Sequence, residues 1–361
     1  MPPVQSYLAH TQPGFEAIAV QELRARLDGV VIHSTHTVED KNGVVLFDYA
    51  GDVRGLFALR TIEDVFAIVF SEPNLPFTRE ALRRLEALAK ETSAVEAALN
   101  LAKIIQPGRG GRGKTSFRVV ARQVEQAAYR RVDAQRAIER GITSRTDRQW
   151  RFAEEGAIEF WLTLLPGAAL LALRLSDETM RHREYKLEHL PASLRPSAAA
   201  GLVWLTEPRE DDVFLDPMCG AGTVLIERAE MGRYQLLLGG DLRTEALRVV
   251  RTNIGPRYKP IELREWDARH LPLDAGSVSA AAVNLPFGKQ IGTPDHNRTL
   301  YPAFLCEMAR VLRPQARLVA LTSDARGFLV SLERTEGFAR RATLHVRILG
   351  QPARIYVIER L

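Results

Sequence analysis

The chain has only two cysteines among its 361 residues, Cys219 and Cys306. Two cysteines are too few for a disulfide framework, and neither has neighbours spaced like metal ligands, so we expect no metal site. No apolar run approaches the roughly 20 residues that cross a bilayer. Residues 1–5 lack the basic and apolar regions of a secretory signal. These absences predict a cytoplasmic protein with no membrane partner and no obligatory protein partner.

A second absence concerns a glycine. Residues 214–223 read F-L-D-P-M-C-G-A-G-T, an apolar strand that ends in Asp216 and leads through a glycine loop into a helix. Gly220 and Gly222 are not followed by the third glycine that packs beside a pyrophosphate in dinucleotide-binding loops. This disfavours a dehydrogenase and favours S-adenosyl-L-methionine, which has no pyrophosphate and whose cationic end Asp216 can face. A strand–turn–helix without a ligand is the alternative.

A second polar strand end follows about seventy residues later, where residues 283–288 read V-N-L-P-F-G. An exocyclic amine on a base is a poor nucleophile, and two acceptors on its hydrogens would aim its lone pair at a methyl donor. The Asn284 side-chain oxygen and the Leu285 carbonyl are candidates. Pro286 fixes the chain direction, and Phe287 offers a ring for a flipped base. The alternative is a strand-terminating turn.

Two further acids follow expected strands. Asp241 lies 25 residues after Asp216, where an acid commonly accepts hydrogen bonds from ribose hydroxyls, although it could instead cap the helix expected over 243–253. Asp267 follows the strand expected over 261–266 and could accept the adenine amino hydrogen or lie in a solvated loop.

The two motifs together resemble the class I amino-methyltransferases with the N/D-P-P-Y/F motif, with Leu285 in place of the first proline. They are most similar to the tRNA guanine-N2-methyltransferases that carry a THUMP domain (the TrmN group), and L-R-P-S at 194–197 resembles that group's L-R-P-T. The resemblance implies direct methylation of the N2 amine of a guanosine in tRNA, at position six of the acceptor stem. Alternatives are an rRNA guanine-N2 or DNA adenine-N6 methyltransferase and a non-catalytic RNA-binding protein.

The predicted site residues fall into two groups in this half of the chain. The catalytic candidates are Asn284, Leu285, Pro286 and Phe287. The cofactor-binding candidates are Arg195, Ser197, Asp216, Cys219, Gly220, Gly222, Thr223, Asp241, Leu242, Asp267, Ala268 and Asn284.

Positive charge gathers in another part of the chain. Residues 103–151 hold thirteen Lys or Arg and four Asp or Glu, an excess of nine. Such an excess favours a polyanion such as tRNA, with a solvated basic surface as the alternative. The RNA-binding candidates are Arg109, Arg112, Lys114, Arg118, Arg122 and Lys289.

One motif within this basic segment is misleading. Residues 108–115 match G-x-x-x-x-G-K-[ST], but a phosphate-binding loop follows a strand and opens a helix. Here the apolar spacing predicts a helix before the loop, over 94–105, and a strand after it, over 116–122. We therefore reject an NTPase.

The fold class is α/β. We expect a ferredoxin-like N-terminal region (1–60), a THUMP RNA-binding domain (61–176), a linker (177–193) and a Rossmann-fold methyltransferase domain with a doubly wound sheet (194–361). In the last domain we expect strands near 213–217, 234–240, 261–266, 280–284, 316–322, 339–349 and 353–360, and helices near 198–205, 222–231, 243–253, 301–312 and 325–335. The resemblance implies seven strands, one of them antiparallel. We expect Cys306 to be a core residue of the helix over 301–312.

Overall fold

The computed structural model describes residues 5–38, 41–107, 114–123, 127–155, 158–287 and 294–361. The chain divides into two compact units, one formed by residues 1–10 and 23–180 and the other by residues 11–22 and 181–361. No helix among the described residues is both long and apolar enough to span a bilayer.

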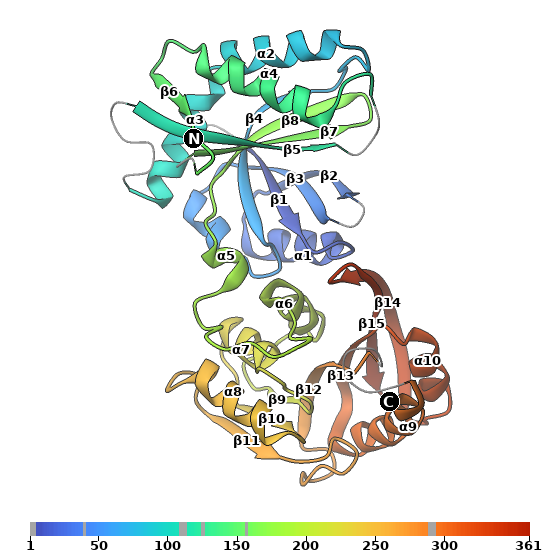
Figure 1. Cartoon of the computed structure of the whole chain (residues 1–361). Coiled ribbons are helices and arrows are strands. Elements are labelled where there is room, and N and C mark those ends of the chain that lie inside the picture. The colour runs from blue at the N-terminus through green and yellow to red at the C-terminus, as the bar shows by residue number, and fades with distance from the viewer. Residues whose placement is uncertain (1–4, 39–40, 108–113, 124–126, 156–157, 288–293) are drawn as a thin grey trace. The chain divides into compact units, whose positions relative to one another are not determined.

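An eight-stranded sheet forms the first unit, in the order β2-β3-β1-β4-β8-β7-β5-β6 (Figure 1). Its strands are β1 (Gln5–Thr11), β2 (Val31–Val38), β3 (Asn42–Tyr49), β4 (Asp64–Glu72), β5 (Lys114–Gln123), β6 (Gln149–Phe152), β7 (Ile158–Leu165) and β8 (Ala168–Arg174). The helices of this part of the chain are α1 (Glu16–Arg26), η1 (Val53–Ala58), α2 (Glu80–Glu91), α3 (Ala94–Ile105), α4 (Arg131–Thr143) and α5 (Thr179–His182). The helix α3 before the glycine–arginine segment and the strand β5 after it confirm that this segment lacks the strand-to-helix context of a phosphate-binding loop. One sheet therefore includes strands from both regions that the sequence suggested, and the division at residue 60 stays a prediction.

The second unit is a seven-stranded sheet in the order β11-β10-β9-β12-β13-β15-β14. Its strands are β9 (Val213–Asp216), β10 (Leu236–Asp241), β11 (Ile261–Glu265), β12 (Val278–Asn284), β13 (Leu312–Thr322), β14 (Phe338–Ile348) and β15 (Gln351–Arg360). Its helices are α6 (Pro196–Leu205), α7 (Thr223–Glu230), α8 (Thr244–Ile254), α9 (Pro294–Val311) and α10 (Ala325–Glu333). The first five strands are parallel, and only β15 runs against the others, as the resemblance implied.

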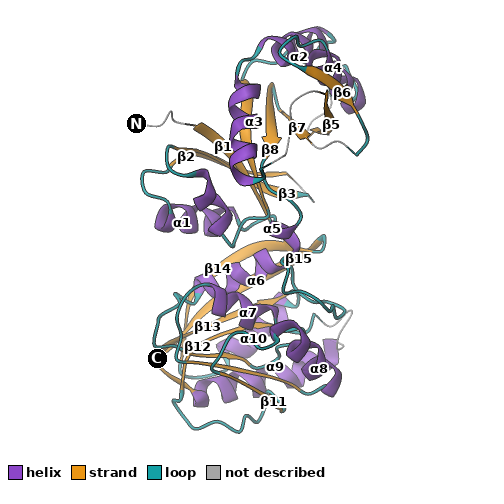
Figure 2. Ribbon diagram, turned by 90° about the vertical axis from the view of Figure 1, so that its left-hand side faces the viewer, coloured by secondary structure: helices purple, strands orange, loops and turns teal. Residues whose placement is uncertain are grey.

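Helices cover both faces of this sheet (Figure 2). Apolar side chains of α6, α7 and α8 pack on one face. Those of α9 and α10 pack on the other. The strand order changes direction between β9 and β12, and in open α/β sheets the crevice outside the carboxyl ends of such strands binds ligands. The expected Rossmann-type arrangement is confirmed, and it brings Asp216 and Asn284 to one edge of the sheet.

Two details of the second unit differ from the sequence-based expectation. Helix α9 begins at Pro294, seven residues earlier than expected, because proline fits the first helical position, where its missing N–H has no partner to lose. Cys306 lies on this helix but is exposed rather than part of the core. The core face of α9 is instead formed by Tyr301, Phe304, Leu305 and Met308.

Candidate active site

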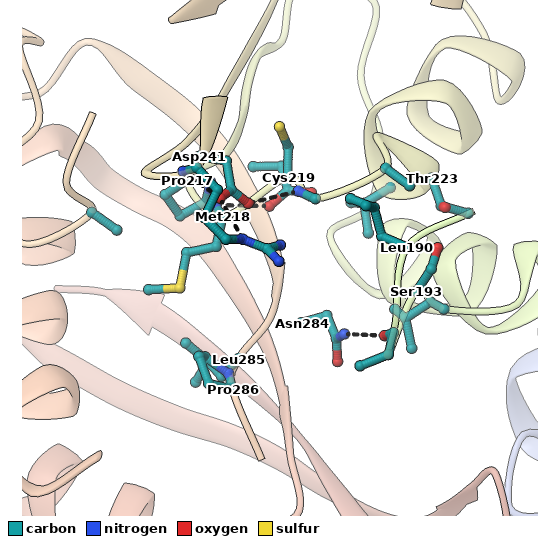
Figure 3. Close-up of a pocket in the computed structure, with 18 of the residues that line it drawn as sticks. Leu190, Ser193, Pro217, Met218, Cys219, Thr223, Asp241, Asn284, Leu285 and Pro286 are labelled. Atoms are coloured by element: carbon teal, nitrogen blue, oxygen red, sulfur yellow. Dashed lines mark hydrogen bonds and ion pairs between the residues drawn. The ribbon is translucent and has the colours of Figure 1, made fainter. Parts of the chain in front are cut away.

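A cavity of about 310 Å³ lies at the carboxyl ends of β9, β10 and β12 (Figure 3). Twelve of the predicted residues line it: Asp216, Cys219, Gly220, Thr223, Asp241, Leu242, Asp267, Ala268, Asn284, Leu285, Pro286 and Phe287. The two motifs, separated by about seventy residues, therefore share one cavity.

Three predicted cofactor residues do not line the cavity. Arg195 is the residue before α6, and Ser197 is buried within the first turn of that helix. Gly222 has a left-handed backbone (φ +81°), and a Cβ built there would lie 2.4 Å from Val250 Cγ2 of α8. The backbone itself thus requires a glycine at this position, with or without a ligand. Cofactor contact by these three residues stays a prediction.

The loop after β9 is held by hydrogen bonds from neighbouring strands. Asp241 Oδ2 accepts from the Gly220 backbone N–H (3.1 Å), and the Cys219 N–H donates to the Gly240 carbonyl (2.8 Å). The Trp266 indole N–H donates to the Pro217 carbonyl (3.0 Å). Asp241 also accepts from the Arg243 N–H (3.0 Å), so it holds the glycine loop and the start of α8 together.

Asp216 lies at the base of this loop and is almost fully buried. Its carboxylate accepts a hydrogen bond from the Met218 N–H (3.3 Å), and no ion pair joins it to a cation among the described residues. Burial, with a smaller contribution from the nearby Asp241, raises the pKa of the Asp216 carboxyl to about 8. A buried acid without a counter-charge fits a ligand that brings a positive charge into the cavity.

Asp267 is held differently, because it pairs with Arg269 at 2.6 Å. Hydrogen bonds from Arg269 lower the pKa of the Asp267 carboxyl, so the acid is ionised near neutral pH. Both side chains line the cavity. The carboxylate can therefore accept a ligand N–H only where Arg269 leaves one of its lone pairs accessible.

Asn284 stands at the end of β12, opposite the segment 190–194 (Figure 3). Its side-chain N–H donates to the Ala192 carbonyl (3.4 Å), and Figure 3 shows its amide oxygen directed away from that carbonyl. This oxygen, Oδ1, is buried and accepts no hydrogen bond in the described part of the chain. A buried acceptor without a donor is costly, which favours a ligand donor at this point.

The backbone after Asn284 is fixed from both sides. The Leu285 N–H donates to the Leu321 carbonyl of β13 (2.9 Å). The Pro286 carbonyl accepts from the hydroxyl of Tyr301 (2.8 Å) and from the side-chain N–H of Asn297 (3.4 Å), both on α9. The geometry of this turn is thus set by packing before any ligand enters.

The segment 190–194 forms a wall of the cavity, although sequence reasoning treated residues 190–193 only as a linker and Leu194 only as the start of the L-R-P-S motif. Ala192 adopts a left-handed backbone (φ +60°), which turns its carbonyl to Asn284. Lys186 Nζ donates to the Leu194 carbonyl (2.5 Å) and so anchors the other end of the segment. Burial, with a smaller contribution from the nearby Arg195, lowers the pKa of Lys186 to about 8. No short motif signals a left-handed alanine, which is why the wall was not predicted.

Other lining residues that the sequence did not single out come from two places. Some flank predicted residues, namely Pro217, Met218, Ala221, Val224, Arg243, Trp266 and Arg269. Others come from helix α9 and from the turn between β14 and β15, namely Leu300, Ile348, Leu349 and Gln351. The first group could have been predicted because its members are sequence neighbours of predicted residues. The second group reaches the cavity only through the tertiary fold.

The structure describes only some of the RNA-binding candidates. Arg109, Arg112 and Lys289 are outside the described residues, and only the backbone of Lys114 is described. Arg118 pairs with Glu159 at 2.8 Å, and the Arg122 guanidinium lies over the Trp161 ring at 4.4 Å from its centroid.

Residues 183–351 match the model of the family UPF0020, described as RMKL-like, methyltransferase domain. The mouse protein "tRNA (guanine(6)-N(2))-methyltransferase THUMP3" is 33% identical over 218 residues, covering 56% of this chain and 43% of its own length. The Thermus thermophilus tRNA (guanine(6)-N2)-methyltransferase is 28% identical over 273 residues, covering 73% of this chain and 78% of its own.

Solved structures agree along the whole chain. TrmN from Thermus thermophilus superposes with a TM-score of 0.78 and 25% identity, covering 99% of this chain and all of that one. A putative methyltransferase, SMU.472, solved with SAH, has a TM-score of 0.71 at 16% identity, covers 99% of this chain and 98% of that one, and supports the fold alone. The chain spans less than half the length of the mouse relative. The match over residues 183–351 and these relatives confirm the resemblance to the TrmN group for the methyltransferase domain, and the THUMP domain stays a prediction.

Proposed function

We propose that this chain, whose residues 183–351 form a methyltransferase domain, transfers a methyl group from S-adenosyl-L-methionine to the N2 amine of a guanosine in tRNA. The observation that carries the proposal is the buried, unpartnered Oδ1 of Asn284 in the same cavity as the uncompensated Asp216. The Asn284 oxygen can accept a hydrogen bond from an N–H group, and the Asp216 carboxylate can pair with a cation. The proposed target, position six, is taken from the relatives' names.

The cavity residues fit the cofactor. Asp216 lies where a cation would relieve its burial, and Asp241 stands at the end of β10, where a carboxylate can accept ribose hydroxyl hydrogens. Leu242 is exposed and apolar, and it lines the cavity beside Asp267, as an adenine site requires. When bound, S-adenosyl-L-methionine supplies a methyl group made electrophilic by its sulfonium.

The chain's own residues then hold the target amine. In this proposal Asn284 Oδ1 accepts one of its hydrogens and the Leu285 carbonyl accepts the other, which directs the nitrogen lone pair away from the ring. Phe287 supplies an aromatic face against which the base can stack. Because Pro286 is held by Tyr301, the acceptors are positioned before the base arrives. The rate enhancement comes mainly from alignment.

The first unit is proposed to bind the tRNA, as a THUMP-containing region would. Support comes from the basic excess in residues 103–151 and from exposed arginines of that segment such as Arg136 and Arg151, which form no ion pair among the described residues. A tRNA substrate would place the protein in the cytoplasm.

The test is mass spectrometry of nucleosides after incubation of tRNA with the protein and labelled methyl donor. The expected product is N2-methylguanosine at a single position. A transcript with inosine there, which lacks the N2 amine, should remain unlabelled. Label on another base, or in inosine tRNA at the same rate, would overturn the proposal.

A further inference from the structure

The hairpin of β14 and β15 carries Gln351 beyond the edge of the sheet. Leu349 and Gly350 form a two-residue turn, both with positive φ, and Ile348 pairs with Gln351 at its base. Pairing of β15 with β13 ends at Thr322 opposite Arg354, so Gln351 lies three residues further along. At about 3.4 Å per residue, this is roughly 10 Å past the carboxyl end of β13. Gln351 therefore reaches the level of the cavity, which it lines.

Gln351 shares an unusual property with Asn284. Its side-chain oxygen Oε1 is buried and accepts no hydrogen bond in the described part of the chain. Native proteins rarely bury such acceptors without a donor. Two amide oxygens from distant parts of the chain thus line one cavity, each without a donor, and this is the pattern expected where a ligand presents two donors.

We propose that Gln351 Oε1 accepts the N1–H of the target guanine while Asn284 Oδ1 accepts the N2–H, so that Gln351 selects guanine. The inference rests on the proposed function. Guanine carries N1–H and N2–H₂ side by side on its Watson–Crick edge. Adenine has an acceptor at N1 and no amine at C2. It would therefore leave Gln351 Oε1 without a donor and place this oxygen opposite the N1 acceptor of the base. A buried polar group discriminates strongly against an analogue that lacks its partner.

The experiment compares two tRNA transcripts, one with guanosine and one with 2-aminopurine ribonucleoside at the target position. 2-Aminopurine keeps the exocyclic amine but has no hydrogen on N1. Single-turnover transfer is measured for the natural protein and for Gln351→Ala. We expect Gln351→Ala to slow methylation of guanosine roughly tenfold to a hundredfold, the value of one buried hydrogen bond, and not to slow methylation of 2-aminopurine. Differences in intrinsic reactivity of the two bases cancel, because each base is compared with itself.

Matched variants separate recognition from folding. Gln351→Glu keeps an acceptor oxygen and should retain the preference for guanosine, whereas Gln351→Met keeps the length but not the acceptor and should lose it. Thr343→Ala, on the same hairpin but outside the cavity lining, should change neither substrate. Binding of both transcripts to protein loaded with SAH measures the same preference where transfer is slow.

Two outcomes would overturn the inference. Equal loss on both transcripts in Gln351→Ala would mean that Gln351 only supports the hairpin. An undiminished guanosine preference in Gln351→Met would mean that another group reads N1. Absence of transfer by the natural protein to any transcript would instead count against the proposed function.

Discussion

A charge network in the first unit and the cavity of the second unit treat their polar side chains in opposite ways. In the first unit, buried and half-buried charges satisfy one another, as in the chain of contacts from Arg118 to Glu159, from Glu159 to Arg174 and from Arg174 to Asp64. In the second unit, the cavity keeps the oxygens of Asn284 and Gln351 without donors and leaves Asp216 without a cation. The first arrangement stabilises a sheet. The second preserves polar groups for a ligand.

The ion pairs of the first unit also affect how much positive charge the basic segment, residues 103–151, has available for a ligand. Its local excess of nine charges is reduced by acids outside it, since Arg118, Arg140 and Arg148 pair with Glu159, Glu86 and Glu96. The net charge counted along residues 103–151 is therefore larger than the positive charge that is available to contact phosphates. In the second unit, by contrast, the motifs identified Asn284, whose side-chain oxygen accepts no hydrogen bond from the described residues.

The sharpest test of the contrast is Asn284→Ala. The substitution removes an acceptor that has no protein donor and one long hydrogen bond to the Ala192 carbonyl (3.4 Å), so stability should change little while transfer falls on the order of a hundredfold. Single-turnover methyl transfer with both ligands saturating measures the chemical step, and cofactor and tRNA affinities should change far less. Near-natural turnover by Asn284→Ala would mean that residues 284–287 only form a strand-terminating turn and have no catalytic role.

Asp241→Ala should produce the next largest effect. Two ribose hydrogen bonds and the bond to the Gly220 N–H would be lost, so cofactor affinity should fall about tenfold to a hundredfold, or about 1–3 kcal/mol. Calorimetry with EDTA present measures the affinity. Asp211→Ala, at an exposed acid before β9, is the matched control and should bind normally. Unchanged binding by Asp241→Ala would remove this residue from the cofactor site.

Cofactor affinity should also depend on pH through Asp216. Its pKa of about 8 in the free protein means that the carboxyl is protonated below that pH, and a cationic ligand binds the carboxylate. Binding should therefore weaken as pH falls from 8 to 6, by up to about tenfold per unit, and level off above 8. Calorimetry in buffers of different ionisation enthalpy should show proton release on binding at pH 7. Asp216→Asn should flatten the profile, and a flat profile in the natural protein would argue against a cationic partner.

Tyr301→Phe should have a smaller effect. It removes the hydroxyl that donates to the Pro286 carbonyl and contacts Thr322 Oγ1 at 2.9 Å. One lost positioning bond should lower kcat about fivefold without a matching change in cofactor affinity. Tyr356→Phe, which removes a hydroxyl bonded to Ala325 outside the cavity, is the control. A change in KM alone would contradict a role in fixing the catalytic turn.

The smallest effects are expected in the basic segment. Replacing Arg109, Arg112 and Lys114 with alanine should weaken tRNA binding and lower the slope of log affinity against log salt by up to about three. A matched triple replacement of the ion-paired Arg84, Arg130 and Arg140 removes the same charge and should lower the slope less. Filter binding across salt concentrations measures both. Equal slopes for the two variants would remove Arg109, Arg112 and Lys114 from the proposed RNA-binding surface.

The sequence predicted most of the catalytic unit because its strands are apolar and their ends carry recognisable motifs. It did not predict Gln351 as a site residue, since only the hairpin register brings that turn to the cavity. The edge strand β2 was also missed, because V-I-H-S-T-H-T-V mixes polar residues with short apolar ones. In the basic segment, pairing partners such as Glu86 and Glu96 are distant in sequence, so no local count could include them.

The division of the chain has a consequence for its synthesis. Phe15 and Ile18 belong to the second unit and are buried in the same apolar cluster as Leu202 and Val203 of α6. These partners leave the ribosome almost two hundred residues later. Until then, these two large apolar side chains of the nascent chain lack their native neighbours and are open to chaperones. The second unit can complete its core only by recovering a segment that was synthesised much earlier, so this part of its folding waits for the synthesis of α6.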